Sequence, residues 1–175
     1  DDLHRDDLLN RVLDELLDIF DCDRAWMIDI GPGPVDVATF AERCRAGFGT
    51  DGVQEGGLPD EMMQALIGKV DLGSSEPTRF DPATDRYKAV HPKSGERPWF
   101  ASQLAMPLFP HGDHRWILGL HHCTEAHTYG EAWPLFRAIG RRISSRLTEQ
   151  MAITQLRTSE QRYRAMIDYA AEAIM

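Results

Sequence analysis

The sequence has few cysteines and no long apolar run. Its 175 residues include three cysteines, Cys22, Cys44 and Cys123, at widely separated positions. This excludes the dense disulfide framework of small secreted proteins and favours a reducing compartment. No apolar stretch approaches the roughly 20 residues that a membrane-spanning helix needs, and no signal peptide is recognisable. We therefore expect a cytoplasmic location.

Positive charge is also scarce. The chain carries 19 Lys and Arg against 28 Asp and Glu, a formal net charge of −9, so we expect no nucleic-acid partner and no binding to an anionic membrane. Glycine motifs that bind phosphate are missing, because neither GxxxxGK[ST] nor a GxGxxG after a strand occurs. The sequence offers no recognisable catalytic constellation, so we do not expect this chain to be an enzyme.

The charges that are present are unevenly distributed. Residues 1–21 hold eight acidic side chains against two arginines, whereas residues 137–146 hold four arginines and no acid. An acidic first helix and a basic last helix would suit each other as packed neighbours, and we favour that pairing. The alternative is that both charged surfaces are solvated, where ion pairs contribute little.

Hydrophobic periodicity predicts a long helix at each end of the chain. Leucines at helical spacing predict an amphipathic helix over 3–20. A second helix is predicted to begin at Gly130 and to run past residue 160. Its two apolar series do not share one phase, so we expect a stutter or break near residue 150. The segment TSE (158–160) could also cap a fresh helix that begins at EQRYRAM.

Between the two long helices the sequence predicts paired strands. Segments rich in aromatic, β-branched or alternating apolar residues are separated by turns such as GPGP and PHGDH. A stretch rich in turn formers, with Tyr87, Trp99 and Phe100 in or beside it, is expected to cover something apolar. This order of elements indicates an α+β fold with an antiparallel sheet. The predicted strands are 24–30, 35–47, 102–109 and 115–123, with a short helix at 58–69 and the turn-rich stretch at 70–98.

Histidines and a cysteine gather at the end of the last predicted strand, in LGLHHCTEAHTYGEAWPLF (118–136). A metal site or a catalytic Cys–His pair is one interpretation of these residues. Neighbours in a strand point to opposite faces, so His121 and His122 cannot easily share one ion. The spacing of His121, His122, Cys123 and His127 also matches no recognised zinc pattern. We expect no bound metal and interpret His122 as a hydrogen-bonded histidine on a mostly buried face.

Two stretches, LLDIFDCDRAWMIDI and SQLAMPLFPHGDHRWILGLHHCTEAHTYGEAWPLFRAIGRRISSRL, resemble GAF domains of bacterial sensor proteins. The resemblance implies an antiparallel sheet with the terminal helices on one face and a loop-covered pocket on the other. The tail LRTSEQRYRAMIDYAAEAIM (156–175) resembles the start of a PAS domain. The chain would then comprise a GAF-like sensory domain, 1–150, and a helical linker with the beginning of a truncated PAS domain, 151–175.

The resemblance also implies a ligand pocket on one face of the sheet. Small Ala105 and Gly119 would let helices approach one face closely, so we assign the bulkier face to the pocket, with a histidine as its polar group. Large apolar residues are also ordinary core residues, and the two faces could be exchanged. The candidate lining residues are Trp26, Ile28, Leu104, Met106, Leu118, Leu120 and His122.

The ligands of recognised GAF subfamilies fit this sequence poorly. Phytochrome GAF domains resemble it around Asp23, Arg24 and the histidine pair, with His122 in place of their pocket histidine. Their PxSDIP-type stretch, which seats a bilin pigment, is missing, and GGLPDEMMQAL (56–66) stands near its place. The NKxnFxxxDE signature of cyclic-nucleotide GAF domains is absent, and the cysteines are too scattered for a methionine sulfoxide reductase. We expect neither bilin, haem nor metal, and the small-molecule ligand is unidentified.

The resemblance further implies a role in bacterial signal transduction. GAF–PAS arrangements usually precede a histidine kinase of a two-component system and less often a diguanylate cyclase. In the first interpretation, ligand binding in a pocket of this chain is relayed through the last helix to PAS and output domains. In the alternative, side chains fill the pocket and the domain is a ligand-free dimerising spacer. Either role fits a parallel homodimer through an apolar seam on the last helix, interrupted by Glu160. The seam residues are Ile153, Leu156, Tyr163 and Ile167.

Overall fold

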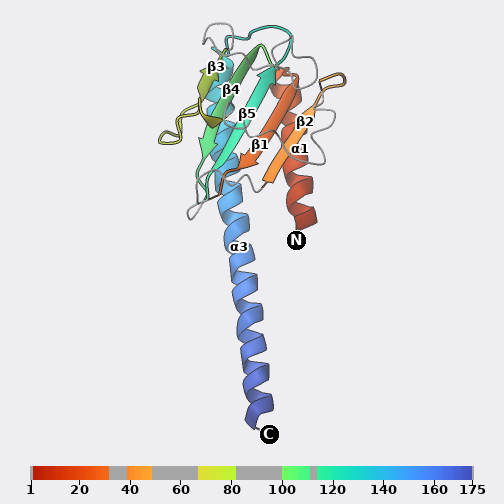
Figure 1. Cartoon of the computed structure of the whole chain (residues 1–175), viewed down its shortest axis with the longest axis vertical. Coiled ribbons are helices and arrows are strands. Elements are labelled where there is room, and N and C mark those ends of the chain that lie inside the picture. Colours follow the sequence, from red (N-terminus) through yellow and green to blue (C-terminus); the bar gives the residue numbers. More distant parts are fainter. Residues whose placement is uncertain (1, 32–38, 49–66, 82–99, 111–113, 175) are drawn as a thin grey trace.

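The computed structural model describes residues 2–31, 39–48, 67–81, 100–110 and 114–174. Within these residues, a five-stranded antiparallel sheet carries two long helices on one face (Figure 1). The strands lie in the order β2-β1-β5-β4-β3, so the last strand in sequence is the middle one in space. The predicted α+β class and the placement of both terminal helices are confirmed. The elements are α1 (Asp2–Phe20), β1 (Arg24–Asp29), β2 (Thr39–Cys44), β3 (Thr78–Phe80), β4 (Ser102–Leu108), β5 (Trp116–His122) and α3 (Ala132–Ile174).

Most of the predicted elements are found with small changes at their ends. The first helix and three of the four predicted strands agree within two residues, and the second strand, Thr39–Cys44, is shorter than predicted at its described end. The short strand β3 was not predicted, because three residues are too few to show a period of two. Most of the predicted short helix, Tyr87 and Trp99 lie outside the described residues.

The helix-side core explains why α1 and α3 cover the same face of the sheet. Apolar side chains at helical spacing on α1 and α3 meet every second side chain of β1, β4 and β5, as alternation in a strand requires. Gly140 lets α3 approach β4, because a Cβ there would lie 2.3 Å from Met106 Sδ. The core residues include Leu13, Leu16, Phe20, Met27, Leu104, Met106, Leu118, Leu120, Phe136 and Leu147.

Helix α3 is continuous over 43 residues, a length of roughly 65 Å at 1.5 Å per residue. Of the expected stutter or break near residue 150, the break is therefore wrong and TSE caps no new helix, whereas a stutter is compatible with a continuous helix. The only proline within α3, Pro134, lies in its first turn, where the missing N–H is tolerated. The hydroxyl of Thr158 donates to the carbonyl of Thr154, inside the helix. Neither described helix is apolar enough over a sufficient length to cross a bilayer.

The favoured pairing of an acidic first helix with a basic last helix is not seen in the described part of the chain. Asp14 on α1 pairs with Arg43 of β2, while Arg137 and Arg141 on α3 both contact Glu76. All these pairs are partly exposed, so each contributes little to stability. Each helix is tied by charge to the edge of the sheet beside it, which leaves space between the two helices.

Substitution of Gly119 tests the packing at the centre of the sheet. A Cβ at Gly119 would lie 2.1 Å from an indole carbon of Trp26, which is buried and rigid. Gly119→Ala should lower the free energy of unfolding by about 1–3 kcal/mol through overpacking, as measured by urea denaturation. Gly130→Ala is the control, because a Cβ at Gly130 meets nothing within 4 Å.

The same substitution in a Trp26→Leu background separates this clash from a general effect of alanine in the strand. Residues in contact give non-additive effects, so Gly119→Ala should cost clearly less once the indole is gone. An equal loss in both backgrounds would contradict this packing.

Candidate functional site

The residues predicted to line one pocket are divided between the two faces of the sheet. We call the face opposite α1 and α3 the outer face. Trp26 and Ile28 lie on the outer face, whereas the four other apolar candidates face the helices, so the prediction of one shared face is wrong. The physical reason is register: Trp26 lies opposite Gly119, not Leu118, across β1 and β5. The candidates on the helix side are Leu104, Met106, Leu118 and Leu120.

The small residues of the central strands have a different role from the one predicted. They were expected to let helices approach, but Gly119 accommodates the indole of Trp26 on the outer face. Ala105 belongs to the same outer-face cluster. The helices approach the other face, where a glycine on α3, Gly140, provides the space instead.

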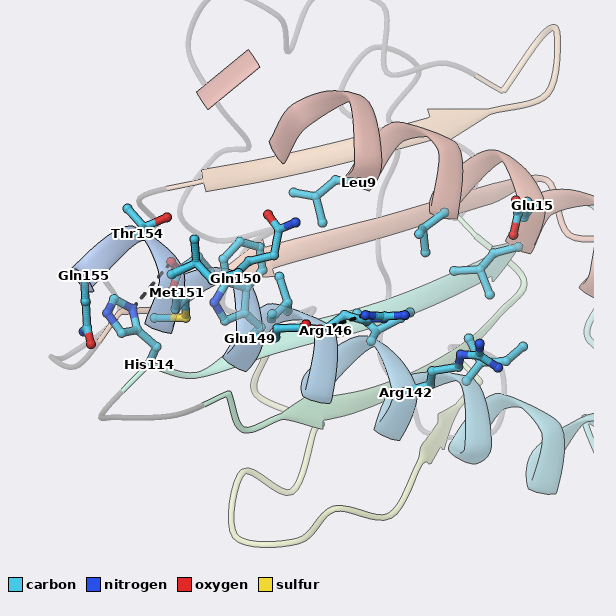
Figure 2. Close-up of a pocket in the computed structure, with 18 of the residues that line it drawn as sticks. Leu9, Glu15, His114, Arg142, Arg146, Glu149, Gln150, Met151, Thr154 and Gln155 are labelled. Carbon is cyan, nitrogen blue, oxygen red and sulfur yellow. Dashed lines mark hydrogen bonds and ion pairs between the residues drawn. The ribbon is translucent and has the colours of Figure 1, made fainter. Parts of the chain in front are cut away.

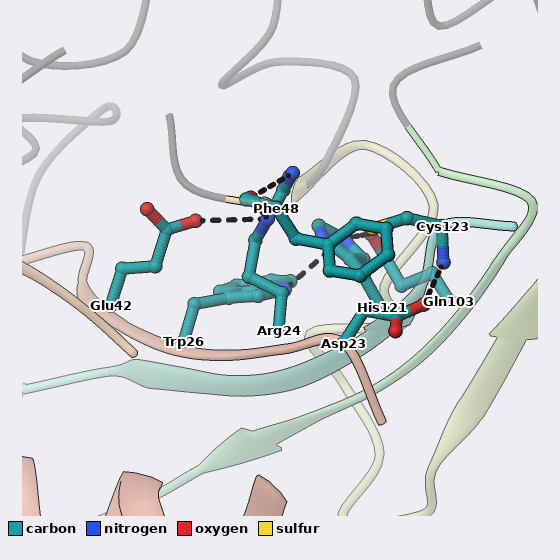
Figure 3. A network of polar contacts seen from close by, with 8 residues as sticks. All are labelled: Asp23, Arg24, Trp26, Glu42, Phe48, Gln103, His121 and Cys123. Carbon is teal, nitrogen blue, oxygen red and sulfur yellow. Dashed lines mark hydrogen bonds and ion pairs between the residues drawn. The ribbon is translucent and has the colours of Figure 1, made fainter. Parts of the chain in front are cut away.

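Trp26, Gln103 and His121 form a buried polar cluster on the outer face (Figure 3). The indole N–H of Trp26 donates to Nε2 of His121 at 3.1 Å, and the side-chain oxygen of Gln103, Oε1, lies 3.0 Å from the same nitrogen. An indole N–H can only donate, so Nε2 accepts the bond from Trp26 when the proton of the neutral imidazole is on Nδ1, whereas a bond to the Gln103 oxygen needs the proton on Nε2. Phe100 stacks on this ring with the centroids 4.3 Å apart.

Burial keeps His121 neutral. The ring is fully buried, and desolvation holds its pKa well below the ordinary value, with the charges of Arg24 and His122 acting in the same direction. A protonated ring would also lose the bond from Trp26, since Nε2 could no longer accept. The sequence suggested His121 as a metal ligand or as part of a Cys–His pair, because its contacts with Trp26 and Phe100 depend on strand pairing that the sequence does not reveal.

Arg24 places a buried positive charge beside this cluster. Its guanidinium lies 3.3 Å from Oε1 of Glu42 and donates to the carbonyl of Phe48 at 2.9 Å (Figure 3). A buried charge needs such partners because desolvation is costly. Arg24 therefore fixes the segment after β2 against β1, at the edge of the outer-face cluster.

The contacts of Cys123 argue against nucleophilic catalysis at this position. Its backbone N–H donates to Asp23 at 2.7 Å, and burial raises the pKa of its thiol to about 11. The thiol is thus protonated near neutral pH, and the protonated form is neither a good nucleophile nor a metal ligand. The described residues contain no group of three or more His, Cys, Asp or Glu side chains arranged to hold a metal ion.

His122 points to the helix side, with Leu118 and Leu120, at the end of β5. Its Nδ1 lies 2.8 Å from the hydroxyl of Tyr129, which confirms the interpretation of a hydrogen-bonded histidine. The face that it shares is covered by helices, so its assignment to a pocket on the loop-covered face is wrong. The segment between β5 and α3 supplies its other neighbour, His127, whose ring stacks on it with the centroids 4.5 Å apart.

A groove of about 890 Å³ runs between α1 and α3 over the start of β5 (Figure 2). Its walls are mostly apolar and come from both helices, with Trp116 as part of its base. Charged residues such as Arg142 and Glu149 also line it. The groove depends on the separation of two helices that are distant in sequence, so periodicity alone could not predict it. Apolar residues in the lining include Leu9, Val12, Leu16, Ile19, Ile139, Ile143, Met151 and Ile153.

Comparisons with known proteins identify the fold. No family model and no curated protein matches the chain. Among solved structures, it is similar to GAF3 from Slr1393 of Synechocystis sp. PCC6803 in its photoproduct state, with a TM-score of 0.66 and 16% identity over 86% of this chain and 97% of that one. It is also similar to NpR6012g4, a red/green cyanobacteriochrome in its green light-absorbing state, with a TM-score of 0.59 and 15% identity over 85% and 97% of the two chains.

A third similar structure is a far-red cyanobacteriochrome photoreceptor, with a TM-score of 0.53 and 13% identity over 85% of each chain. These identities are low, so the likeness extends to the fold alone. The chain has a GAF-like α+β fold with a long C-terminal helix, as the sequence resemblance predicted.

Removing one donor tests the assignment of His121. Trp26→Phe keeps most of the ring but loses the indole N–H, and leaving a buried acceptor without its donor costs about 1–3 kcal/mol of unfolding free energy. Urea denaturation would measure this loss, with Trp133→Phe as the control. NMR should show His121 remaining neutral in the variant, because burial is the main cause of its low pKa. Titration of His121 near its ordinary value in the unmodified protein would contradict the assignment.

Proposed function

We propose that this chain is a sensory module of a signal-transduction protein, in which a small ligand on the outer face changes the position of α3. The helix would relay that change to PAS and output domains following in the same chain. The observation that carries the proposal is α3 itself, which is packed on the sheet at one end and extends far beyond it at the other (Figure 1).

The two ends of α3 have different environments. Phe136, Ile143 and Leu147 are buried against the sheet, whereas the described side chains beyond Met151 are exposed. A continuous helix is stiff, so a shift at its packed end moves its exposed end. A sensor needs two arrangements of nearly equal free energy that a ligand can bias through differential affinity. The sheet and the long helix together supply the parts for such a mechanism.

The GAF-like fold supports the sensory class. The solved structures of similar fold include light-absorbing photoreceptors, which are sensors. We do not propose a bilin pigment for this chain, because its sequence lacks the PxSDIP-type stretch that seats one. A histidine kinase is the output that we favour, from the PAS-like tail at 151–175, with a diguanylate cyclase as the alternative. No catalytic role is proposed for this chain.

A ligand-free spacer is the second candidate function, and one observation favours it. The described part of the outer face is tightly filled, since Phe100 stacks on His121 and makes an edge contact with Phe80. Under this alternative, α3 serves dimerisation alone. Binding experiments distinguish the two functions, because a filled face binds no ligand.

Thermal shift measurements test the ligand. A metabolite library should contain a small apolar or amphipathic compound that raises the melting temperature by mass action, since a ligand at 100 times its Kd stabilises by about 2.7 kcal/mol. Trp26→Ala should abolish the shift, while Leu156→Ala, far along α3, should retain it. Native mass spectrometry of the purified protein would detect a ligand retained from the cell. No shift across the library, together with no bound mass, would favour the spacer.

We also propose a parallel homodimer through α3, which both candidate functions require. The predicted seam residues are exposed, with Leu156 at 70% and Tyr163 at 63%. Met166 and Tyr169 add exposed apolar surface near the end of the helix. The seam begins at Ile153, which also lines the groove between α1 and α3. A second copy could therefore cover a continuous apolar surface from the groove to the seam.

A charge in the seam should disrupt this dimer. Leu156→Asp should weaken it by at least tenfold in Kd, because an unpaired carboxylate would be buried between the helices. Thr158→Asp is the matched control, since residue 158 lies on the opposite side of the helix from the seam. Sedimentation equilibrium measures both. A monomer at high concentration, or equal effects of the two variants, would rule out this interface.

A further inference from the structure

Four side chains connect the end of β5 to the start of α3. Nδ1 of His122 lies 2.8 Å from the hydroxyl of Tyr129, which lies 3.2 Å from Oγ of Ser102 on β4. The same Oγ accepts the backbone N–H of His127 at 2.9 Å. The rings of His122 and His127 are stacked, with an interplanar angle of 9°. We call these residues the histidine cluster.

The hydrogen bonds of the histidine cluster have one consistent direction. The N–H of His127 can only donate, so Ser102 Oγ accepts it and can donate its own proton to Tyr129. The hydroxyl of Tyr129 then donates to His122, and Nδ1 must be unprotonated to accept. Burial raises the pKa of Tyr129, so its proton stays in place. In this direction of the bonds, Nδ1 of His122 carries no proton.

The charged groups around His122 act in opposite directions. Desolvation is the main factor that lowers its pKa, and His127 lowers it further. Asp21 and Asp23, from the turn between α1 and β1, favour the protonated form. A backbone hydrogen bond with Phe20, at the end of α1, also favours protonation. The ring is therefore affected by three parts of the fold: the end of α1, the turn between α1 and β1, and the segment that leads into α3.

Tyr129 links the histidine cluster to α3. Its backbone has a positive φ of 58°, an unfavourable conformation for a tyrosine that the surrounding contacts must maintain. Its carbonyl accepts the N–H of Trp133 at 2.9 Å, in the first turn of α3. Loosening the contacts of the Tyr129 hydroxyl removes part of what holds this backbone in place.

We propose that the histidine cluster is a proton-sensitive switch, in which protonation of His122 reverses the bond from Tyr129 and loosens the first turn of α3. A proton on Nδ1 turns the Tyr129 hydroxyl from donor to acceptor. The Tyr129 proton must then turn towards Ser102, which already accepts from His127. A positive charge on His122 also lies against the stacked ring of His127, and this neighbour opposes protonation of His122.

The expected direction with pH follows from these contacts. The pKa of His122 is lowered in the folded state from its ordinary value of 6.5, so folding favours the neutral ring. The stabilisation by the cluster is complete above about pH 6.5 and is lost as the pH falls through the folded pKa. The proton is thus an input at the helix side of the sheet, separate from a ligand on the outer face.

NMR titration of the whole chain tests the switch. The His122 ring should titrate with a midpoint below 6.5, and the backbone amides of His127 and Trp133 should shift with the same midpoint. In His122→Asn, an amide oxygen can accept from Tyr129 without titrating, so these shifts should disappear. His114→Gln is the control, because His114 is a partly exposed histidine on the other end of β5, and it should leave them unchanged.

A second variant keeps the test decisive if His122→Asn does not fold. His127→Phe retains the stacked ring without its charge, so the midpoint of His122 should rise. The switch would be overturned if the backbone amide shifts of His127 and Trp133 do not follow the titration of His122. It would also be overturned if these pH-dependent amide shifts persist in His122→Asn. An unchanged His122 midpoint in His127→Phe would also overturn it. This NMR readout needs no ligand and no output domain. The proton switch can therefore be refuted while the sensory function holds, and the sensory function can be refuted while the switch holds.

Discussion

The alternation of side chains along β5 is the constraint on which the rest of the structure depends. This strand lies in the middle of the sheet and is buried on both faces. Two neighbouring side chains of β5 therefore lie on opposite faces, one on the outer face and one beside the helices. His121 joins Trp26 and Phe100 on the outer face, while His122 contacts Tyr129 and His127 beside the helices. A single strand thereby connects the face that could hold a ligand with the start of the helix that leaves the domain.

Burial on both faces also explains which predictions from the sequence succeeded. Helix α1 and the sheet-packed half of α3 each have one apolar side, so their periodicity predicted that both helices pack on the sheet. Every residue of β4 and β5 is buried, so apolar character could not show which face of either strand meets the helices. The assignment of Leu118 and Leu120 to the pocket failed for this reason, and Gly119 was misread because its space is filled by Trp26 from another strand.

The break predicted in α3 failed for a related reason. A change of phase in the apolar pattern marks a change in what the helix packs against. Here α3 continues beyond the sheet, and its described side chains after Met151 are exposed. The hydrogen-bonded state of His122 was predicted correctly, because a polar ring on a buried strand needs a partner. The identity of that partner, Tyr129, required the path of the segment between β5 and α3, and no local pattern gives that path.

In the proposed mechanism, the packed end of α3 transmits the state of the sheet to its exposed end. Distance measurements between spin labels at residue 158 of two copies test this most directly, in a variant whose native cysteines are replaced. The account predicts two distance populations whose proportions change between about pH 8 and about pH 5.5, the range in which histidine changes charge. A single distribution that stays unchanged over this range, in a dimer that remains intact, would contradict it.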